Sequence, residues 1–118
     1  MNQGSDQILE NTKQFAAAVR DLGKVIPMTV SNVEDLKQLI RSSGAVGASY
    51  IAAVGAAGRK EYLLGIRNCL TEARNTHYWL GLIDTQGAPE LEKRRSQLMQ
   101  IAEDLAQLFI QVIQSANK

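Results

Sequence analysis

Apolar residues recur along most of the chain in alternating steps of three and four, which is the spacing of one face of an α-helix. This spacing predicts four helices, roughly over residues 6–25, 32–57, 59–85 and 89–116. The alternation of apolar and polar residues that marks β-strands is not sustained anywhere. Short connections make consecutive helices antiparallel neighbours. The sequence therefore predicts an all-α fold, an antiparallel up-down-up-down four-helix bundle, with residues 1–118 forming a single domain.

Residues that favour helix ends lie near the predicted boundaries. Asp6 is expected to cap the first helix, because its carboxylate accepts hydrogen bonds from the unpaired N–H groups of a first turn. Ser31 and Glu34 have the spacing of a capping box at the start of the second helix. Gly87 is expected to end the third helix, and Pro89 to lie in the first turn of the fourth.

The second predicted helix contains a stretch of seventeen residues without charge, SSGAVGASYIAAVGAAG, of which thirteen are Gly, Ala or Ser. Every fourth residue of a helix stacks on one face, so small side chains form two adjacent rows here. The rows are Gly44, Ala48, Ala52 and Ala56, and Ala45, Ser49, Ala53 and Ala57. The core-facing stripe of the same helix is predicted to be Leu36, Ile40, Ser43, Gly47, Tyr50 and Val54.

Small rows of this kind let another backbone approach closely. Glycine within a helix costs about 1 kcal/mol relative to alanine, so packing has to offset the loss. Two explanations are open, which are close packing wholly within one bundle and contact with another subunit or partner. We predict the second, with an interface formed by Gly44, Ala45, Ala48, Ser49, Ala52, Ala53 and Ala56.

The formal net charge is +1, which excludes a global basic field for nucleic acid but leaves a basic face open. Lys60, Arg67 and Arg74 recur every seven residues and therefore follow one side of the third predicted helix. A row of charges is also the ordinary appearance of a solvated face. The candidate RNA contacts are Arg59, Lys60, Arg67, Arg74, Lys93, Arg94 and Arg95.

Catalytic chemistry has few candidates. His77 is the single histidine, and Glu72 and Asp84, five and seven residues away, are not suitably spaced to orient it as a general base. Cys69 is the single cysteine, so we expect neither a disulfide nor a Cys/His metal site. We interpret both residues as packing residues. The sequence predicts a protein that is not an enzyme and uses no cofactor.

The expected location in the cell follows from the lack of a secretory signal and of a membrane-spanning stretch in the sequence. The opening residues, MNQGSDQILENTKQ, are polar and mixed in charge, unlike a secretory signal. No apolar stretch reaches the ~18 residues of a membrane span. We therefore expect a cytoplasmic protein without a membrane partner.

Two segments resemble the 23S ribosomal RNA intervening-sequence proteins, a family of four-helix bundles. Residues 38–53, QLIRSSGAVGASYIAA, are similar to the family segment Q-L-x-R-S-x-x-S-V-G-A-N-Y-x-E-A. Residues 60–83, KEYLLGIRNCLTEARNTHYWLGLI, resemble its third helix, with the pattern E-F … E-A … Y-W-L-x-L-L. Here that pattern is carried by Glu61, Tyr62, Glu72, Ala73, Tyr78, Trp79, Leu80, Leu82 and Ile83. The resemblance covers roughly residues 30–115.

The resemblance implies a bacterial four-helix bundle that assembles as a homopentamer, without enzymatic activity of its own. A structural relative of the family, the accessory protein of diversity-generating retroelements, binds a reverse transcriptase and RNA. The chain departs from the family pattern at Ser49, where Asn is usual, and at Ala52, where Glu is usual. These changes make the helix more apolar and favour the interface interpretation.

We therefore predict a non-enzymatic oligomeric scaffold that acts by binding RNA, a protein partner or both. The alternative is a dedicated nucleic-acid-binding accessory protein, for example to the reverse transcriptase of a retroelement.

Overall fold

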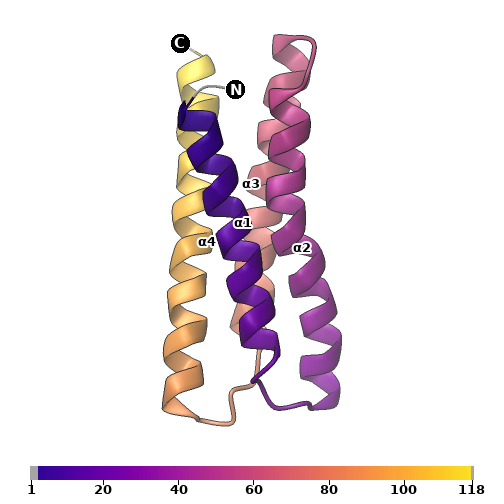
Figure 1. The fold of residues 1–118 in the computed structure, drawn as a ribbon, viewed down its shortest axis with the longest axis vertical. Coiled ribbons are helices and arrows are strands. Elements are labelled where there is room, and N and C mark those ends of the chain that lie inside the picture. Colours follow the sequence, from indigo (N-terminus) through magenta and orange to yellow (C-terminus); the bar gives the residue numbers. More distant parts are fainter. Residues whose placement is uncertain (1–2, 118) are drawn as a thin grey trace.

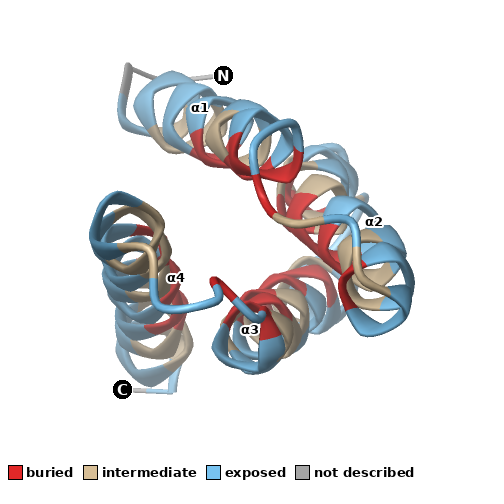
Figure 2. Cartoon of the chain, turned by 90° about the horizontal axis from the view of Figure 1, so that it is seen from below, coloured by how far each residue is buried: buried red, intermediate tan, exposed pale blue. Residues whose placement is uncertain are grey.

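The computed structural model describes residues 3–117 and consists of four helices joined by short loops. The helices are α1 (Gln3–Gly23), α2 (Val30–Val54), α3 (Arg59–Leu82) and α4 (Pro89–Ala116). Consecutive helices alternate in direction along the long axis, and the two chain ends lie at the same end of the molecule (Figure 1). Seen end-on, the helices follow one another in chain order around a ring, with the buried residues facing inward (Figure 2). The prediction of an all-α four-helix bundle is confirmed.

The core is built from one stripe of apolar side chains on each helix. Its largest fully buried members include Phe15, Leu22, Leu39, Ile66, Leu80 and Phe109. The predicted stripe on α2 is wrong at two positions, because Leu39 and Val46 are buried in place of Ile40 and Gly47. Gly47 instead faces α1, where an added Cβ would lie 2.8 Å from the Thr12 hydroxyl oxygen. The missing side chain thus allows α1 to pack directly against α2.

Helices α2 and α3 are in close contact where Ala53 meets Gly65. A Cβ added to Gly65 would lie 2.6 Å from the Ala53 Cβ and 2.8 Å from its Cα, which real carbon atoms do not tolerate. Ala53 is 1% exposed. This residue of the predicted subunit interface therefore packs inside its own bundle, and we remove it from that interface.

A buried asparagine ties together the two loops at one end of the bundle. The Asn32 amide nitrogen donates to the backbone carbonyls of Pro27 and Asp84, each at 2.8 Å. The Asn32 amide oxygen accepts the backbone N–H of Asp84 at 2.9 Å. Since Asn32 is fully buried, each of these bonds replaces one that water would otherwise supply.

Several predicted helix boundaries are corrected by the structure. Helix α1 includes Gln3–Gly23, so Asp6 lies within its first turn and does not cap it. Thr29, not Ser31, caps α2, because the Thr29 hydroxyl accepts the Asn32 N–H at 3.1 Å.

The later boundaries move as well. Helix α2 ends at Val54 and not at residue 57. Helix α3 ends at Leu82 and not at residue 85, because the chain turns extended at Ile83, whose side chain is buried. Gly87 lies in the following loop with φ +75°, beyond the helix end it was expected to cap. Pro89 does begin α4, as predicted.

Within the described residues, none of the helices combines the length and the apolar character that crossing a bilayer requires.

The contact between Gly65 and Ala53 generates a prediction about stability. Gly65→Ala should destabilise the fold by about 1–3 kcal/mol, because the new methyl group overpacks the contact between α2 and α3. Gly81→Ala is the matched control, since it lies in the same helix and its nearest neighbour, the Met99 methyl, is 3.6 Å away. There, the helix preference of alanine should stabilise the protein by up to ~1 kcal/mol. Urea denaturation measures both values, and equal stabilisation by the two substitutions would contradict the close approach.

Candidate interaction surfaces

An apolar groove runs between α1 and α2 on the outside of the bundle. It encloses about 520 Å³. The lining residues are Leu9, Thr12, Lys13, Ala16, Ala17, Arg20, Gly44, Gly47, Ala48 and Ile51. Ile51 is 57% exposed. The groove therefore presents an exposed isoleucine beside glycine and alanine residues of two neighbouring helices.

The remaining residues of the predicted interface are not equivalent. Gly44 and Ala48 line the groove between α1 and α2. Ala52 is exposed but does not line it, and Ala45, Ser49 and Ala56 are half-buried. The structure thus brings two of the seven predicted residues together with α1.

The outer face of α3 carries a stripe in which basic residues alternate with other side chains at steps of three and four. We call it the α3 stripe, and its exposed members are Lys60, Leu64, Arg67, Thr71, Arg74 and Tyr78. Leu64 and Tyr78 are 59% and 60% exposed. The Tyr78 ring also contacts the Trp79 ring edge-on, with centroids 5.1 Å apart.

The three cations of the α3 stripe have no carboxylate partner in the part of the chain that the structure describes. The ion pairs found there involve Lys24, Lys37, Arg41 and Arg95 only. Their positive charge is therefore not neutralised by this chain, in contrast to Arg41, which lies 3.8 Å from the Glu72 carboxylate. The cations can bind phosphate groups, and the exposed aromatic ring is a flat surface on which a base can stack. The stripe therefore has the two features with which proteins bind single-stranded nucleic acids.

The other predicted RNA contacts are dispersed. Arg59 is exposed at the start of α3, beside Lys60. Lys93 is exposed, whereas Arg94 lines a groove between α1 and α4. The Arg95 side chain is only 20% exposed and donates to the Ile83 carbonyl and to the Glu92 carboxylate.

Arg95 therefore belongs to the connection between α3 and α4, where Glu92 also accepts a hydrogen bond from the Thr85 hydroxyl. We remove Arg95 from the candidate RNA contacts. The consecutive positions 93–95 suggested one basic cluster, but a helix turns by about 100° per residue and separates their directions.

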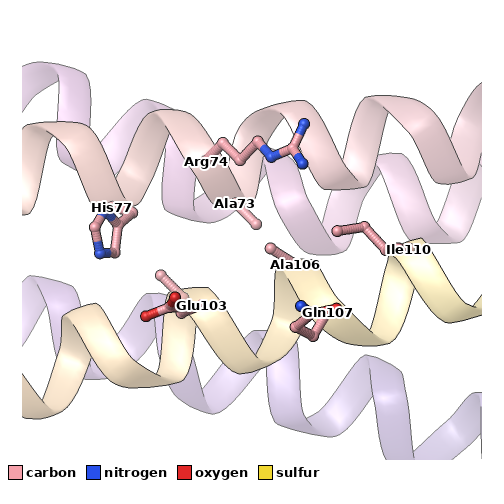
Figure 3. Close-up of a pocket in the computed structure, with 8 residues that line it drawn as sticks. Ala73, Arg74, His77, Glu103, Ala106, Gln107 and Ile110 are labelled. Carbon is pink, nitrogen blue, oxygen red and sulfur yellow. The ribbon is translucent and has the colours of Figure 1, made fainter.

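A small notch opens between α3 and α4, next to the α3 stripe. It encloses about 270 Å³ over three alanines, Ala73, Ala102 and Ala106, all buried. Its rim is formed by Arg74, His77, Glu103, Gln107 and Ile110. Figure 3 shows His77 and Glu103 facing one another from α3 and α4. The notch therefore combines an apolar floor with a rim that carries the Arg74 guanidinium on the α3 side and the Glu103 carboxylate on the α4 side.

No hydrogen bond or ion pair joins His77 to Glu103 among the described residues. Glu103 is nonetheless the acidic residue that the sequence did not reveal as a neighbour of His77. Glu103 follows His77 by 26 residues, so the two residues can be recognised as neighbours only when the register between α3 and α4 is known. Within the described residues, no three acidic, histidine or cysteine side chains are grouped so that they could hold a metal ion.

Cys69 lies in the core and is fully buried. Burial raises the pKa of the Cys69 thiol to about 12. Burial is also the main reason that the pKa of Tyr62 is raised, with smaller contributions from Tyr50 and Cys69. The thiolate is the reactive form of cysteine, so this residue is a packing residue, as the sequence analysis interpreted it.

Comparisons with known proteins point to a solved structure with a similar fold. No protein-family model matches the sequence, and no functionally curated protein matches it. The fold is similar to the crystal structure of a protein of unknown function from the S23 ribosomal protein family of Bacteroides thetaiotaomicron, with a TM-score of 0.76. The two sequences are 22% identical, and the match covers 93% of this chain and 97% of the other. This likeness establishes the shared four-helix fold.

The burial of Cys69 predicts very slow alkylation in the native state. At pH 8, a pKa of about 12 leaves on the order of a thousandfold less thiolate than an exposed cysteine has. Iodoacetamide labelling followed by mass spectrometry should therefore modify Cys69 only after unfolding in urea. In a Cys69→Ala background, Asn68→Cys places a thiol at the exposed neighbouring position and should be labelled rapidly.

The same pKa fixes the direction of a pH effect. Between about pH 9 and pH 12 the unfolded chain loses the Cys69 proton while the folded chain keeps it, so this group's contribution to stability is lost as pH rises through that window. Native labelling of Cys69 as fast as that of the cysteine at position 68 would contradict the assignment.

Proposed function

We propose that this protein is a non-enzymatic scaffold that assembles with copies of itself and binds RNA. The observation that carries the proposal is the groove between α1 and α2, where Ile51 remains 57% exposed next to Gly44 and Ala48. Glycine at position 44 has open space around it, since an added Cβ would meet only the Arg20 guanidinium at 3.6 Å. The fold of the single chain therefore gives no reason for a bare helix surface at this position, whereas a neighbouring subunit does.

A second face, on the other side of α1, supports assembly through unlike surfaces. The groove between α1 and α2 has Lys13 and Arg20 among its lining residues. The grooves between α1 and α4 contain Ile101, which is 41% exposed, and the carboxylates of Asp21 and Asp104. The first face carries Lys13 and Arg20, and the second carries Asp21 and Asp104 together with Arg94, so the net charges of the two linings are opposite in sign.

Contacts between two different faces of identical chains are heterologous, and they produce a ring when the rotation closes. We propose a ring of five copies, the number that the resemblance to the intervening-sequence proteins implies. The S23-family structure supports the bundle fold on which such a ring would be built.

RNA binding is supported by a separate observation, the α3 stripe. Lys60, Arg67 and Arg74 are free of carboxylate partners within the described chain, and they lie about 10 Å apart on one helix face. In the end-on view the pair α1 and α2 lies opposite the pair α3 and α4 (Figure 2), and Arg74 of the stripe also lines the notch between α3 and α4. Assembly through α1 and α2 would therefore leave the stripe exposed on every copy.

The assembly proposal predicts that Ala48→Arg separates the subunits. An arginine at position 48 would put a long side chain on a surface that the neighbouring copy has to approach closely, and overpacking of such a contact costs about 1–3 kcal/mol. Sedimentation equilibrium at micromolar concentration should find a ring of several subunits for the unchanged protein and mainly monomer for the variant. Asn68→Arg adds the same charge at an exposed position of α3, outside both proposed assembly faces, and should leave the assembly intact. A monomeric unchanged protein would refute the proposal.

The RNA proposal predicts a salt-dependent affinity that depends on the α3 stripe. For a uridine-rich single strand, the logarithm of the association constant should fall linearly with the logarithm of salt concentration, with a slope of about −2 for three phosphate contacts per subunit. Arg67→Ala should make the slope shallower by about 0.7. Lys37→Ala removes an equal charge from α2, where Lys37 pairs with Glu34, and should change the slope little. Absence of binding at low salt, measured by fluorescence anisotropy, would refute RNA binding.

A further inference from the structure

The notch between α3 and α4 has a composition that suits one flat, polar-edged ligand. Its volume of about 270 Å³ lies below the roughly 300–1,000 Å³ of pockets that hold drug-sized molecules, so it has room for a single ring system. The floor of buried alanine methyl groups offers an apolar surface against which a flat ring can lie. The polar groups are confined to the rim, on both helices (Figure 3).

The rim has hydrogen-bonding capacity that the chain itself does not use. Glu103 and Gln107 are exposed and take part in none of the side-chain hydrogen bonds or ion pairs of the described residues. A carboxylate accepts hydrogen bonds at both oxygens and donates none when it is ionised. Its best partner is therefore a ligand edge that presents two adjacent N–H donors.

Arg74 connects the notch to the α3 stripe, because it belongs to both. A phosphate held by Arg74 would place the attached nucleoside beside the notch opening. Tyr78 follows one turn later on the same helix and is 60% exposed, so its ring is free to stack with a neighbouring base.

We infer that the notch binds the base of a guanosine in single-stranded RNA, with Glu103 accepting hydrogen bonds from its Watson–Crick edge. The inference rests on the proposed RNA-binding function. Guanine presents two adjacent donors on this edge, the ring N–H and the exocyclic amino group, whereas the other three bases place an acceptor next to each donor. Gln107 reads a further polar group of the base, and Arg74 holds a phosphate. The base enters only from an unpaired strand, since pairing occupies the same edge.

The test compares uridine-rich single strands that differ at one central nucleotide. By fluorescence anisotropy, the strand with guanosine should bind about tenfold more tightly than the strand with adenosine. The strand with inosine, which keeps the ring N–H but lacks the amino group, should lie between them. Glu103→Gln should reduce the preference for guanosine to less than about twofold. Since Glu103 is exposed, this change should not disturb the fold.

Glu61→Gln is the matched control. It removes the same charge from an exposed position of α3 outside the notch, so it should strengthen phosphate binding similarly and keep the preference for guanosine. Salt-dependent binding with equal affinity for all strands would overturn the guanosine site and leave RNA binding intact. Preference for guanosine that survives in Glu103→Gln would overturn the assigned role of Glu103. Absence of binding to every strand would refute RNA binding itself, and the guanosine site with it.

Discussion

The contact between Gly65 and Ala53 sets the spacing of α2 and α3, and the rest of the bundle depends on it. With no side chain at position 65, the two backbones come within a distance that even one methyl group would forbid. The same helix pair then aligns the buried hydroxyls of Ser42 and Thr76, which lie 2.9 Å apart and share a hydrogen bond. At the exposed edge it brings Arg41 to the Glu72 carboxylate. Small residues are thus required inside the bundle as well as for any surface that other subunits meet.

The small residues in the charge-free stretch of α2 consequently have different structural roles. Gly47 allows α2 to pack closely against α1, and Ala53 packs against α3. Gly44 and Ala48 make no such close contact, because a Cβ added to Gly44 would lie 3.6 Å from the Arg20 guanidinium and Ala48 is exposed. The two explanations weighed from the sequence are therefore not exclusive along one helix. Close internal packing accounts for some positions, and the uncovered positions are the ones on which the assembly proposal rests.

Hydrophobic periodicity was sufficient to predict the number, type and approximate extent of the helices, since that signal is repeated over many residues. It failed where a single contact between distant segments decides the outcome. Leu39 is buried and Ile40 is exposed, although the two are neighbouring apolar residues in the sequence. Neither the contact of Arg95 with the Ile83 carbonyl nor the proximity of Glu103 to His77 has a local sequence signal. The positions of the free cations of α3 were predictable, because residues that are seven apart in the sequence lie on the same side of a helix.

The hydrogen bonds of Asn32 give the molecule two unlike ends. At one end, the loops before α2 and before α4 are joined through a buried side chain, so neither can be lengthened without disturbing the other. The opposite end holds the start of α1, the end of α4 and the brief turn between α2 and α3 (Figure 1). Fusion partners, affinity tags or fluorophores are therefore best attached at this second end, where they do not disturb the two loops that Asn32 joins.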